Sequence, residues 1–388
     1  MDLAAAGAAV RTSLNTEALA ADLIALVERE TPSHDAAASA GIAEHLAGLW
    51  RRFGVVRPVA RPVGTHLVVE VAGVGERRDA APVVLLGHSD TVWPVGTLAG
   101  PVPLRVEDGV LRGPGSYDMK AGLVVMLAAV QALGDAGLAH RPLRVVVAAD
   151  EEVGSGSASE LVREQCAGAA AVLGFESPHP DGALKVGRLG STRLRLRVVG
   201  RESHAALDPD GGVSAIDELV DQLVVLRRSV AAVSARHPGQ VLLNVGAIAG
   251  GGRTNVVPGE SEALVGFRFG TPAAEAEVLD AVAALSPLRA GASLEAEVLS
   301  SRPAWQASEA DAALLGQVCA LAGEVGLAAS GRPAAGAADT NTSGALGVPT
   351  LDGFGPRGGG AHAVTEHVLL ESLLDRVVLL VAVLAGLP

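Results

Sequence analysis

Histidine and carboxylate side chains follow three apolar runs of the sequence, at the point where each run ends. The residues in these positions are His88 and Asp90, Asp150 to Glu152, and Glu176, and Asp118 stands in a glycine-rich loop before a predicted helix. Short, wholly apolar runs are typical of strands buried on both faces of a parallel sheet. Ligands bind at the carboxyl ends of such strands, so we expect these side chains to converge at one edge. Histidine nitrogens and carboxylate oxygens favour zinc or a similar divalent ion there.

The spacing of His88 and Asp90 indicates a supporting role for the aspartate. Residues two apart in an extended backbone share a face, so the Asp90 carboxylate can accept the proton of the His88 ring nitrogen that does not bind metal. Such a contact fixes the tautomer of the imidazole that binds the ion. Taken alone, residues 88–90 would also fit an ordinary polar surface loop.

The elements that position these groups alternate between strands and helices. Predicted strands lie at residues 66–71, 82–87, 143–149 and 170–175, and predicted helices at 16–53, with a break at Pro32, and at 120–133 and 157–165. We expect the helix at 120–133 to be closed by Gly134 and Gly137, because glycine is common just past a helix end. The alternation predicts an α/β fold with a mostly parallel sheet and helices on both faces.

The pattern changes at about Leu189, which predicts an inserted domain. Residues 193–199 alternate arginine with leucine or valine, as in a strand with one wet face, and residues 213–236 form a long amphipathic helix. Predicted strands at 241–249 and 262–269, a helix at 272–285 and a strand at 293–299 follow. This order is ferredoxin-like. We therefore assign residues 189–301 to an inserted domain and residues 1–188 and 302–388 to one discontinuous α/β domain.

Composition excludes several classes of protein. The chain has 388 residues, with 30 basic and 43 acidic side chains, and its net charge of −13 disfavours nucleic acid and anionic membranes as partners. Two cysteines without a CxxC spacing exclude a disulfide framework and a thiolate zinc cluster. The apolar stretches at 121–130 and 377–388 are shorter than the roughly 20 residues that a membrane span needs, so we predict core helices. The N-terminus does not read as a secretory signal, which predicts a cytoplasmic location.

Five separated motifs occur in order along nearly the whole chain. They are Gly87-His88-Ser89-Asp90-Thr91-Val92-Trp93-Pro94, Gly113-Pro114-Gly115-Ser116-Tyr117-Asp118-Met119-Lys120, Asp150-Glu151-Glu152, Gly200-Arg201-Glu202-Ser203-His204 and Gly358-Gly359-Gly360-Ala361-His362. Together they closely resemble the zinc-dependent family of glutamate carboxypeptidase, acetylornithine deacetylase and succinyl-diaminopimelate desuccinylase. The strings at residues 174–178 and 301–305 are most similar to the glutamate carboxypeptidase branch.

The resemblance implies a set of metal ligands and a catalytic group. His88 and Glu176 would bind one zinc ion, Glu152 and His362 the other, and Asp118 would bridge them. Two Zn²⁺ per subunit are implied, with Co²⁺ or Mn²⁺ as possible substitutes. Glu151 would act as general base and acid, and Asp90 would support His88. The family also implies a cis peptide after Asp118. His367 is a rival to His362 as a ligand, and the glycine-rich approach favours His362.

The resemblance also assigns roles to the inserted domain. It would be a lid and dimerisation domain, whose His204 reaches the active site of the partner subunit in a homodimer. Asn255 and Arg268 would contact substrate, and Arg302 would hold a substrate carboxylate, to which a bidentate arginine is suited. The alternatives are that His204 acts in its own subunit or only packs, and that the two arginines are structural.

Three functions are compatible with these residues. The first is a dinuclear zinc hydrolase that cleaves the amide bond to a C-terminal, acidic amino acid of an N-acyl or peptidyl small molecule. The second is an N-acyl amino acid deacylase with the same metals. The third is a catalytically silent, dimeric binding protein, which the complete ligand set with Glu151 disfavours. Lys185 and Arg188 depart from the family pattern near the substrate region, so the side-chain selectivity stays open.

Overall fold

The computed structural model describes residues 2–388 and divides them into two compact units. The first unit comprises the chain up to Gly187 together with Ala307–Ala334 and Ala338–Pro388. The second unit comprises Arg188–Gln306 and Ala335–Ala337. The first unit is thus assembled from segments on both sides of the second in the sequence.

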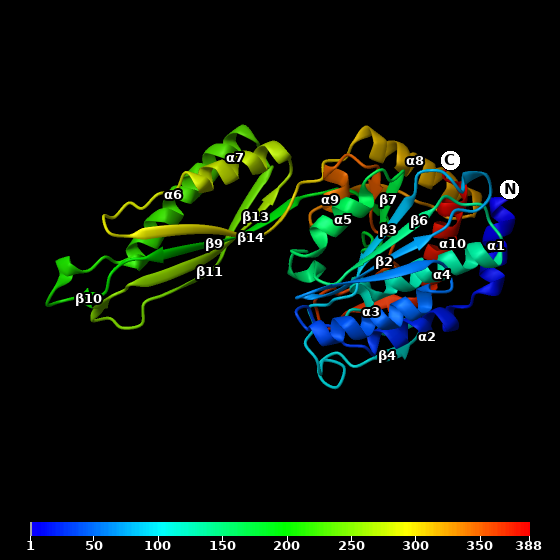
Figure 1. Ribbon diagram of the computed structural model, residues 1–388, viewed down its shortest axis with the longest axis horizontal. Coiled ribbons are helices and arrows are strands. Elements are labelled where there is room, and N and C mark those ends of the chain that lie inside the picture. Colours follow the sequence, from blue (N-terminus) through cyan, green and yellow to red (C-terminus); the bar gives the residue numbers. More distant parts are fainter. Residues whose placement is uncertain (1) are drawn as a thin grey trace. The chain divides into compact units, whose positions relative to one another are not determined.

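A six-stranded mixed sheet forms the centre of the first unit (Figure 1). Its order is β1 (Val55–Arg61), β2 (Gly64–Val71), β6 (Leu143–Ala148), β3 (Val83–His88), β7 (Ala171–Gly174) and β16 (Thr350–Leu351). The last four strands run parallel, whereas β1 and β2 add an antiparallel edge. The prediction of a mostly parallel sheet is confirmed. Strand β1 was not predicted, because Pro58 interrupts its valine run, and proline is tolerated only at such an edge.

Helices cover both faces of this sheet, as predicted. Those of the first unit are α1 (Leu3–Ser13), α2 (Thr16–Val27), α3 (Ala36–Trp50), α4 (Ala121–Asp135), α5 (Ala158–Cys166), α8 (Glu309–Glu324), α9 (Thr340–Ala345) and α10 (Leu370–Gly386). The side chains of β3 point alternately to the two faces of the sheet and pack against a different layer of helices on each face. Val83 and Leu85 join the core formed with α2, α4 and α10, while Val84 and Leu86 pack with α5. The strand is therefore buried on both faces, which is why its sequence is wholly apolar.

Helix α4 is a core helix despite its apolar length. Among the residues described, the stretch Ser116–Asp135 is long and apolar enough to cross a membrane, and 78% of its apolar window is buried inside the protein. The helix runs to Asp135, two residues beyond its predicted end at Leu133, and so includes Gly134. Gly137, with φ of +58°, follows its end. Gly137 therefore adopts the left-handed backbone conformation that closes the helix, which glycine takes without steric cost because it has no Cβ.

The second unit has the ferredoxin-like order predicted from the sequence. Its elements are β9 (Gly190–Val199), α6 (Ala215–Arg236), β11 (Val241–Gly250), β13 (Glu260–Phe269), α7 (Pro272–Ala283) and β14 (Ser293–Arg302). The four strands form an antiparallel sheet in the order β11-β13-β9-β14. Leu194, Leu196 and Val198 of β9 face the core with residues of α6 and α7, while the intervening arginines stay exposed or half-buried. The alternation of apolar and polar residues in this strand thus indicates that one of its faces is buried.

Short elements complete the chain. They are the sheet of β4 (Arg105–Glu107), β5 (Val110–Arg112), β18 (His367–Leu369) and β17 (Gly358–Gly359), the pair β8 (Leu184–Arg188) and β15 (Gly331–Ala334), the pair β10 (Ser203–His204) and β12 (Val256–Val257), and the helical turns η1 (Gly75–Arg77), η2 (Ser116–Lys120), η3 (Glu151–Val153) and η4 (Pro209–Gly211). The small sheet that joins β5 to β18 ties a segment near Asp118 to one near His362. The sequence did not predict it.

Candidate active site and metal centre

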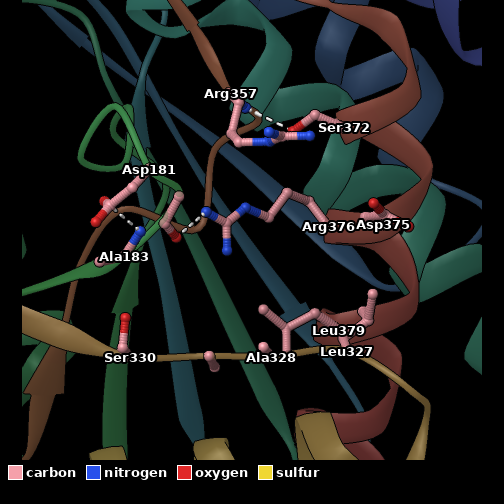
Figure 2. A pocket seen from close by; sticks show the side chains of 12 residues that line it. Asp181, Ala183, Leu327, Ala328, Ser330, Arg357, Ser372, Asp375, Arg376 and Leu379 are labelled. Carbon is pink, nitrogen blue, oxygen red and sulfur yellow. Dashed lines mark hydrogen bonds between the residues drawn. The ribbon is translucent and has the colours of Figure 1, made fainter.

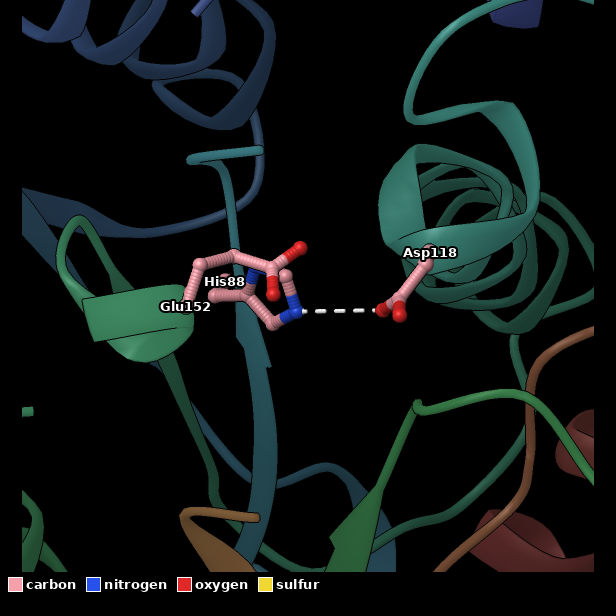
Figure 3. A group of neighbouring side chains, drawn as sticks. All are labelled: His88, Asp118 and Glu152. Carbon is pink, nitrogen blue, oxygen red and sulfur yellow. Dashed lines mark ion pairs between the residues drawn. The ribbon is translucent and has the colours of Figure 1, made fainter. Parts of the chain in front are cut away.

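The five side chains predicted as metal ligands come together in the first unit. The Nε2 atom of His88 lies 3.4 Å from Oδ1 of Asp118 and 3.5 Å from Oε1 of Glu176. The Nε2 atom of His362 lies 3.2 Å from Oδ2 of Asp118 and 3.0 Å from Oε2 of Glu152. Figure 3 shows His88, Asp118 and Glu152 pointing toward one another from separate elements. The two oxygens of Asp118 therefore face two different histidine and glutamate pairs.

Each of these residues stands at the end of an element or in a tight turn. His88 is the last residue of β3, Glu152 lies in η3 directly after β6, and Glu176 follows β7. Because these strands are parallel neighbours, their carboxyl ends bring the three side chains to one edge. Asp118 lies in η2, and the peptide from Asp118 to Met119 is cis, as predicted. His362 lies in the connection between β17 and β18.

The chemistry of this cluster fits a divalent cation. Nε2 of His88 and Oε1 of Glu152 are buried and have no hydrogen-bond partner in the part of the chain that the structure describes. Buried polar atoms without partners are costly, and a cation between them would supply the missing interaction. Ligand atoms of His88, Asp118 and Glu152 lie within 4.8 Å of one another, as do those of His88, Glu151 and Glu176. The residues can therefore hold a metal ion.

The electrostatics of the cluster point the same way. The Asp118 and Glu152 carboxylates raise the pKa of His362 to about 10. Burial would raise the pKa of Asp118, but the neighbouring His362 and His88 rings outweigh it and hold that pKa far below its usual range. Without a metal ion, the positive charge that these carboxylates favour is supplied by protons on the histidine rings. The carboxylates create a strongly negative potential, which attracts a cation and favours neutral, metal-binding histidines once the cation is bound.

Asp90 does more than the sequence indicated. The Nδ1 atom of His88 lies 3.0 Å from the backbone carbonyl oxygen of Asp90 and 3.4 Å from its carboxylate, so the carbonyl is the nearer partner. The buried carboxylate also accepts hydrogen bonds from the backbone N–H groups of Glu151 (3.1 Å) and Glu152 (3.2 Å) and from Oγ of Ser33 (2.7 Å). Asp90 therefore links the strand that ends in His88 to the turn that carries Glu151 and Glu152.

Glu366 supports the site and was missed by sequence reasoning. Its side chain is buried and accepts hydrogen bonds from the backbone N–H groups of Gly115 (2.9 Å), Tyr117 (2.9 Å) and Asp118 (3.1 Å) and from Nε1 of Trp93 (2.7 Å). It thereby orders the loop that presents Asp118. The available signal was a glutamate four residues after His362, on the far side of a predicted loop.

His367, the rival of His362 as a metal ligand, lies outside the cluster. His367 lies in β18, where its Nδ1 contacts the backbone oxygen of Thr365 at 2.9 Å, and it is not part of the cluster. The structure therefore brings His362, and not its rival, to Asp118.

The remaining predicted residues lie in the second unit and not in the cluster. His204 is exposed on β10, and its Nδ1 accepts hydrogen bonds from the N–H groups of Ala206 (3.2 Å) and Leu207 (3.1 Å). The neutral ring therefore carries its proton on Nε2, which makes it a hydrogen-bond donor. Asn255 is exposed in the loop before β12, and its backbone oxygen accepts from the N–H of Ala205 at 3.0 Å. That bond links its loop to the segment after His204.

Arg268 and Arg302 lie on the two strands that flank β9 in the second sheet. Both are in register with Ser191 of the central strand β9, on opposite sides of it. Nη1 of Arg268 donates to Oγ of Ser191. Burial, together with the charge of Arg302, lowers the pKa of Arg268. Two cations of this kind are suited to bind a carboxylate.

Comparison with known proteins identifies the family. Residues 84–386, which include all five clustered side chains, match the model of peptidase family M20/M25/M40. The chain belongs to this family. It is therefore a metallopeptidase-type hydrolase that acts on amide bonds, in agreement with the reaction class predicted from the motifs.

The proteins similar to this chain include a carboxypeptidase, a desuccinylase and an aminopeptidase. The chain is 28% identical over 362 residues to carboxypeptidase G2 of Pseudomonas sp. (strain RS-16), with 90% of this chain and 85% of the relative covered. It is 33% identical over 239 residues to a succinyl-diaminopimelate desuccinylase of Methylorubrum extorquens, with 56% and 59% covered. The structure of aminopeptidase PepT from Bacillus cereus superposes with a TM-score of 0.72 at 22% identity, with 96% of this chain and 99% of that chain covered. The last likeness supports the fold.

Proposed function

We propose that the protein is a dinuclear zinc hydrolase that releases a C-terminal, acidic amino acid from an N-acyl or peptidyl substrate. The observation that carries the proposal is the arrangement around Asp118, whose two oxygens each lie near one histidine, and each of these histidines lies near one glutamate. His88 and Glu176 would hold one ion, and Glu152 and His362 the other. Two Zn²⁺ against three carboxylates leave one positive charge. When bound, such a pair of ions acidifies a water molecule and polarises the scissile carbonyl.

Glu151 is the group that we propose to move the proton. Its side chain is buried, and its carboxylate lies within 4.8 Å of the ligand atoms of His88 and Glu176. The hydrogen bond from its backbone N–H to Asp90 holds it in the turn next to Glu152. From this position it can take the proton of the attacking water and deliver it to the leaving amine.

The proposed selectivity for an acidic amino acid rests on the second unit. Arg268 and Arg302 are two cations that flank β9 at Ser191, and they would bind the carboxylates of the released amino acid. Asn255 would add a polar contact from its exposed loop. Arg188 is less suited to this role, since it is buried and its Nη1 donates to the backbone oxygen of Gly336 at 2.6 Å.

We also propose that the active form is a homodimer. Strand β11 is an edge of its sheet, and apolar side chains are exposed on it and on the adjacent α6: Leu242, Ile248, Val220 and Val224. A groove of about 540 Å³ runs between these two elements. An unpaired edge strand with an apolar surface is a template for pairing with a second copy. His204 would then act as an oxyanion donor in the partner's site, which agrees with the proton on its Nε2.

A substrate panel tests the proposal. Zinc-loaded protein is incubated with N-acyl glutamates, N-acyl aspartates, N-acyl ornithines, N-succinyl diaminopimelate and dipeptides, and the released amine is identified by mass spectrometry. We expect glutamate to be released fastest. Arg302→Gln should lower kcat/KM about 10- to 100-fold for the glutamate substrates, and for dipeptides as well, because each presents a C-terminal carboxylate and a charge-assisted hydrogen bond contributes about 1.5 to 3 kcal/mol.

The deacylase is the second candidate, and the relative of Methylorubrum extorquens favours it. Faster release of ornithine or diaminopimelate than of glutamate, with Arg302→Gln neutral for all substrates, would support deacylation instead. Binding of zinc with no turnover of any substrate would support a silent relative.

A further inference from the structure

The first unit contains a pocket of about 370 Å³ that is separate from the proposed metal ligands. It lies between the loop after β7, the segment before β15 and helix α10 (Figure 2). Its polar lining consists of Asp181, Ser330, Arg357, Ser372, Asp375 and Arg376. None of the five side chains of the proposed metal cluster lines it. Its chemistry therefore needs an explanation of its own.

Arg376 is the central polar group of this pocket. Its side chain is only 8% exposed, and Figure 2 shows it reaching from α10 across the pocket toward the loop of Asp181. Its Nη2 donates to the backbone oxygen of Gly182 at 2.6 Å. Within residues 2–388, this oxygen is the one hydrogen-bond partner of the guanidinium. The remaining N–H groups of Arg376 are left for a ligand, since a guanidinium carries five.

The charge of Arg376 is also unbalanced. The other three charged side chains of the lining are each paired with a residue of opposite charge: Asp181 with Arg332 at 2.8 Å, Asp375 with Arg11 at 2.8 Å, and Arg357 with Glu371 at 3.1 Å. Arg376 has no such ion pair among the residues that the structure describes. The pocket thus carries one net positive charge, centred on a buried side chain.

A buried, unpaired guanidinium is energetically unfavourable unless an anion accompanies it. Burial, together with the charge of Arg357, lowers the pKa of Arg376 to about 10, so the group still carries its charge at neutral pH. A planar guanidinium matches the two oxygens of a carboxylate or phosphate. The opposite wall of the pocket is apolar and includes Leu327, Ala328 and Leu379. The cavity is larger than an inorganic ion needs.

We propose that this pocket is a second binding site, which holds the carboxylate or phosphate group of a small molecule on Arg376 and Arg357. Leu327 and Leu379 would contact a short apolar part of the same molecule. The site does not depend on the proposed function, because none of its groups belongs to the metal cluster. It can therefore be tested on protein from which metal has been removed.

Isothermal titration of the metal-free, full-length protein with butyrate, acetate and inorganic phosphate measures binding without competition from metal. We expect one site per chain that depends on Arg376, apart from any binding of a carboxylate at Arg268 and Arg302, and the same site in the zinc-loaded protein. Tighter binding of butyrate than of phosphate identifies a carboxylate ligand with an apolar chain, and the reverse order identifies a phosphate ligand. If the metal-free wild-type protein binds none of the three, the proposal is wrong, whatever the enzyme hydrolyses.

Variants locate the site. Arg376→Gln should weaken binding about 10- to 100-fold, the effect of one lost charge-assisted hydrogen bond. Arg236→Gln, a surface arginine of the second unit that is paired with Glu277, is the control and should bind like the wild type.

A second pair of variants covers the case in which Arg376→Gln fails to fold. Ala328 is exposed at the edge of the pocket, so Ala328→Asp adds a negative charge there without disturbing the core. We expect it to weaken anion binding at least tenfold, whereas the isosteric, neutral Ala328→Asn should retain most of it. Equal affinities of Ala328→Asp and Ala328→Asn would place the bound anion elsewhere and overturn the proposal.

Discussion

Replacing Glu366 by glutamine tests whether this buried carboxylate positions the loop of Asp118. Oε1 accepts from the N–H groups of Tyr117 and Asp118, and Oε2 from Gly115 and Trp93. A glutamine keeps one of the two acceptor oxygens and turns an NH₂ group toward the other two donors. Two hydrogen bonds to a charged group are then lost. At about 1.5 to 3 kcal/mol each, the free energy of unfolding should fall by about 3 to 6 kcal/mol.

The effect should extend to the metal centre. Replacing a residue that holds a metal ligand in place typically lowers metal affinity about 10- to 100-fold. We expect a loss of this size in Glu366→Gln. Urea denaturation followed by circular dichroism gives the change in stability, and competition with a chelator gives the zinc affinity. Glu297→Gln, which removes one exposed ion pair to Arg195, is the control and should change stability by less than about 1 kcal/mol. Wild-type stability and zinc affinity in Glu366→Gln would refute the reasoning.

Three further variants test the site, and a fourth tests His66, a buried histidine of β2 whose Nε2 lies 2.9 Å from Oγ of Ser157. Glu151→Gln should keep its bound metal and lose nearly all turnover, since the ligands remain and the proton carrier is removed; loss of metal in step with activity would make Glu151 a ligand. Asp118→Ala should lose metal and activity together, and a fully loaded, active variant would contradict the bridging role. His204→Ala should bind zinc with turnover reduced about 100- to 1,000-fold, and mixed dimers with Glu151→Gln should recover activity toward half the wild-type value; no recovery after confirmed exchange would exclude action across the dimer. Burial lowers the pKa of His66 below its usual 6.5, so the unfolded chain binds this proton first and stability should fall with pH below about 6.5, by at most about 1.4 kcal/mol per pH unit. Urea denaturation between pH 5 and 8 should show that His66→Gln lacks this component, and identical pH profiles would contradict it.

The element order and much of the candidate site follow from local sequence patterns. The wholly apolar run before His88 predicts a strand buried on both faces, and parallel neighbours bring the ends of such runs together. The alternation of arginine with leucine or valine at residues 193–199 predicts one buried face, which the packing of Leu194 and Leu196 bears out. These signals are readable because the period of the side chains repeats within a few residues.

His362 is an intermediate case. Only a resemblance of motifs pointed to it, because its segment has no periodic pattern that predicts an element. Its position depends on β17, which pairs with β18, and on β18, which in turn pairs with β5 far earlier in the chain, with His367 opposite Arg112. Once that small sheet is formed, the connection that carries His362 is held near the loop of Asp118.

Tertiary structure alone decided the positions of Glu366 and Arg376. Glu366 bonds to Gly115, 251 residues away, and Arg376 bonds to Gly182, 194 residues away. Tertiary structure also decided the hydrogen bonds of the Asp90 carboxylate, which join two strand ends. The donors are the backbone N–H groups of Glu151 and Glu152, 61 and 62 residues later in the chain. A hydrogen bond between distant residues leaves no periodic trace in either segment. The sequence by itself determines which groups are available and which elements form, whereas the packing of those elements determines which buried charges find partners.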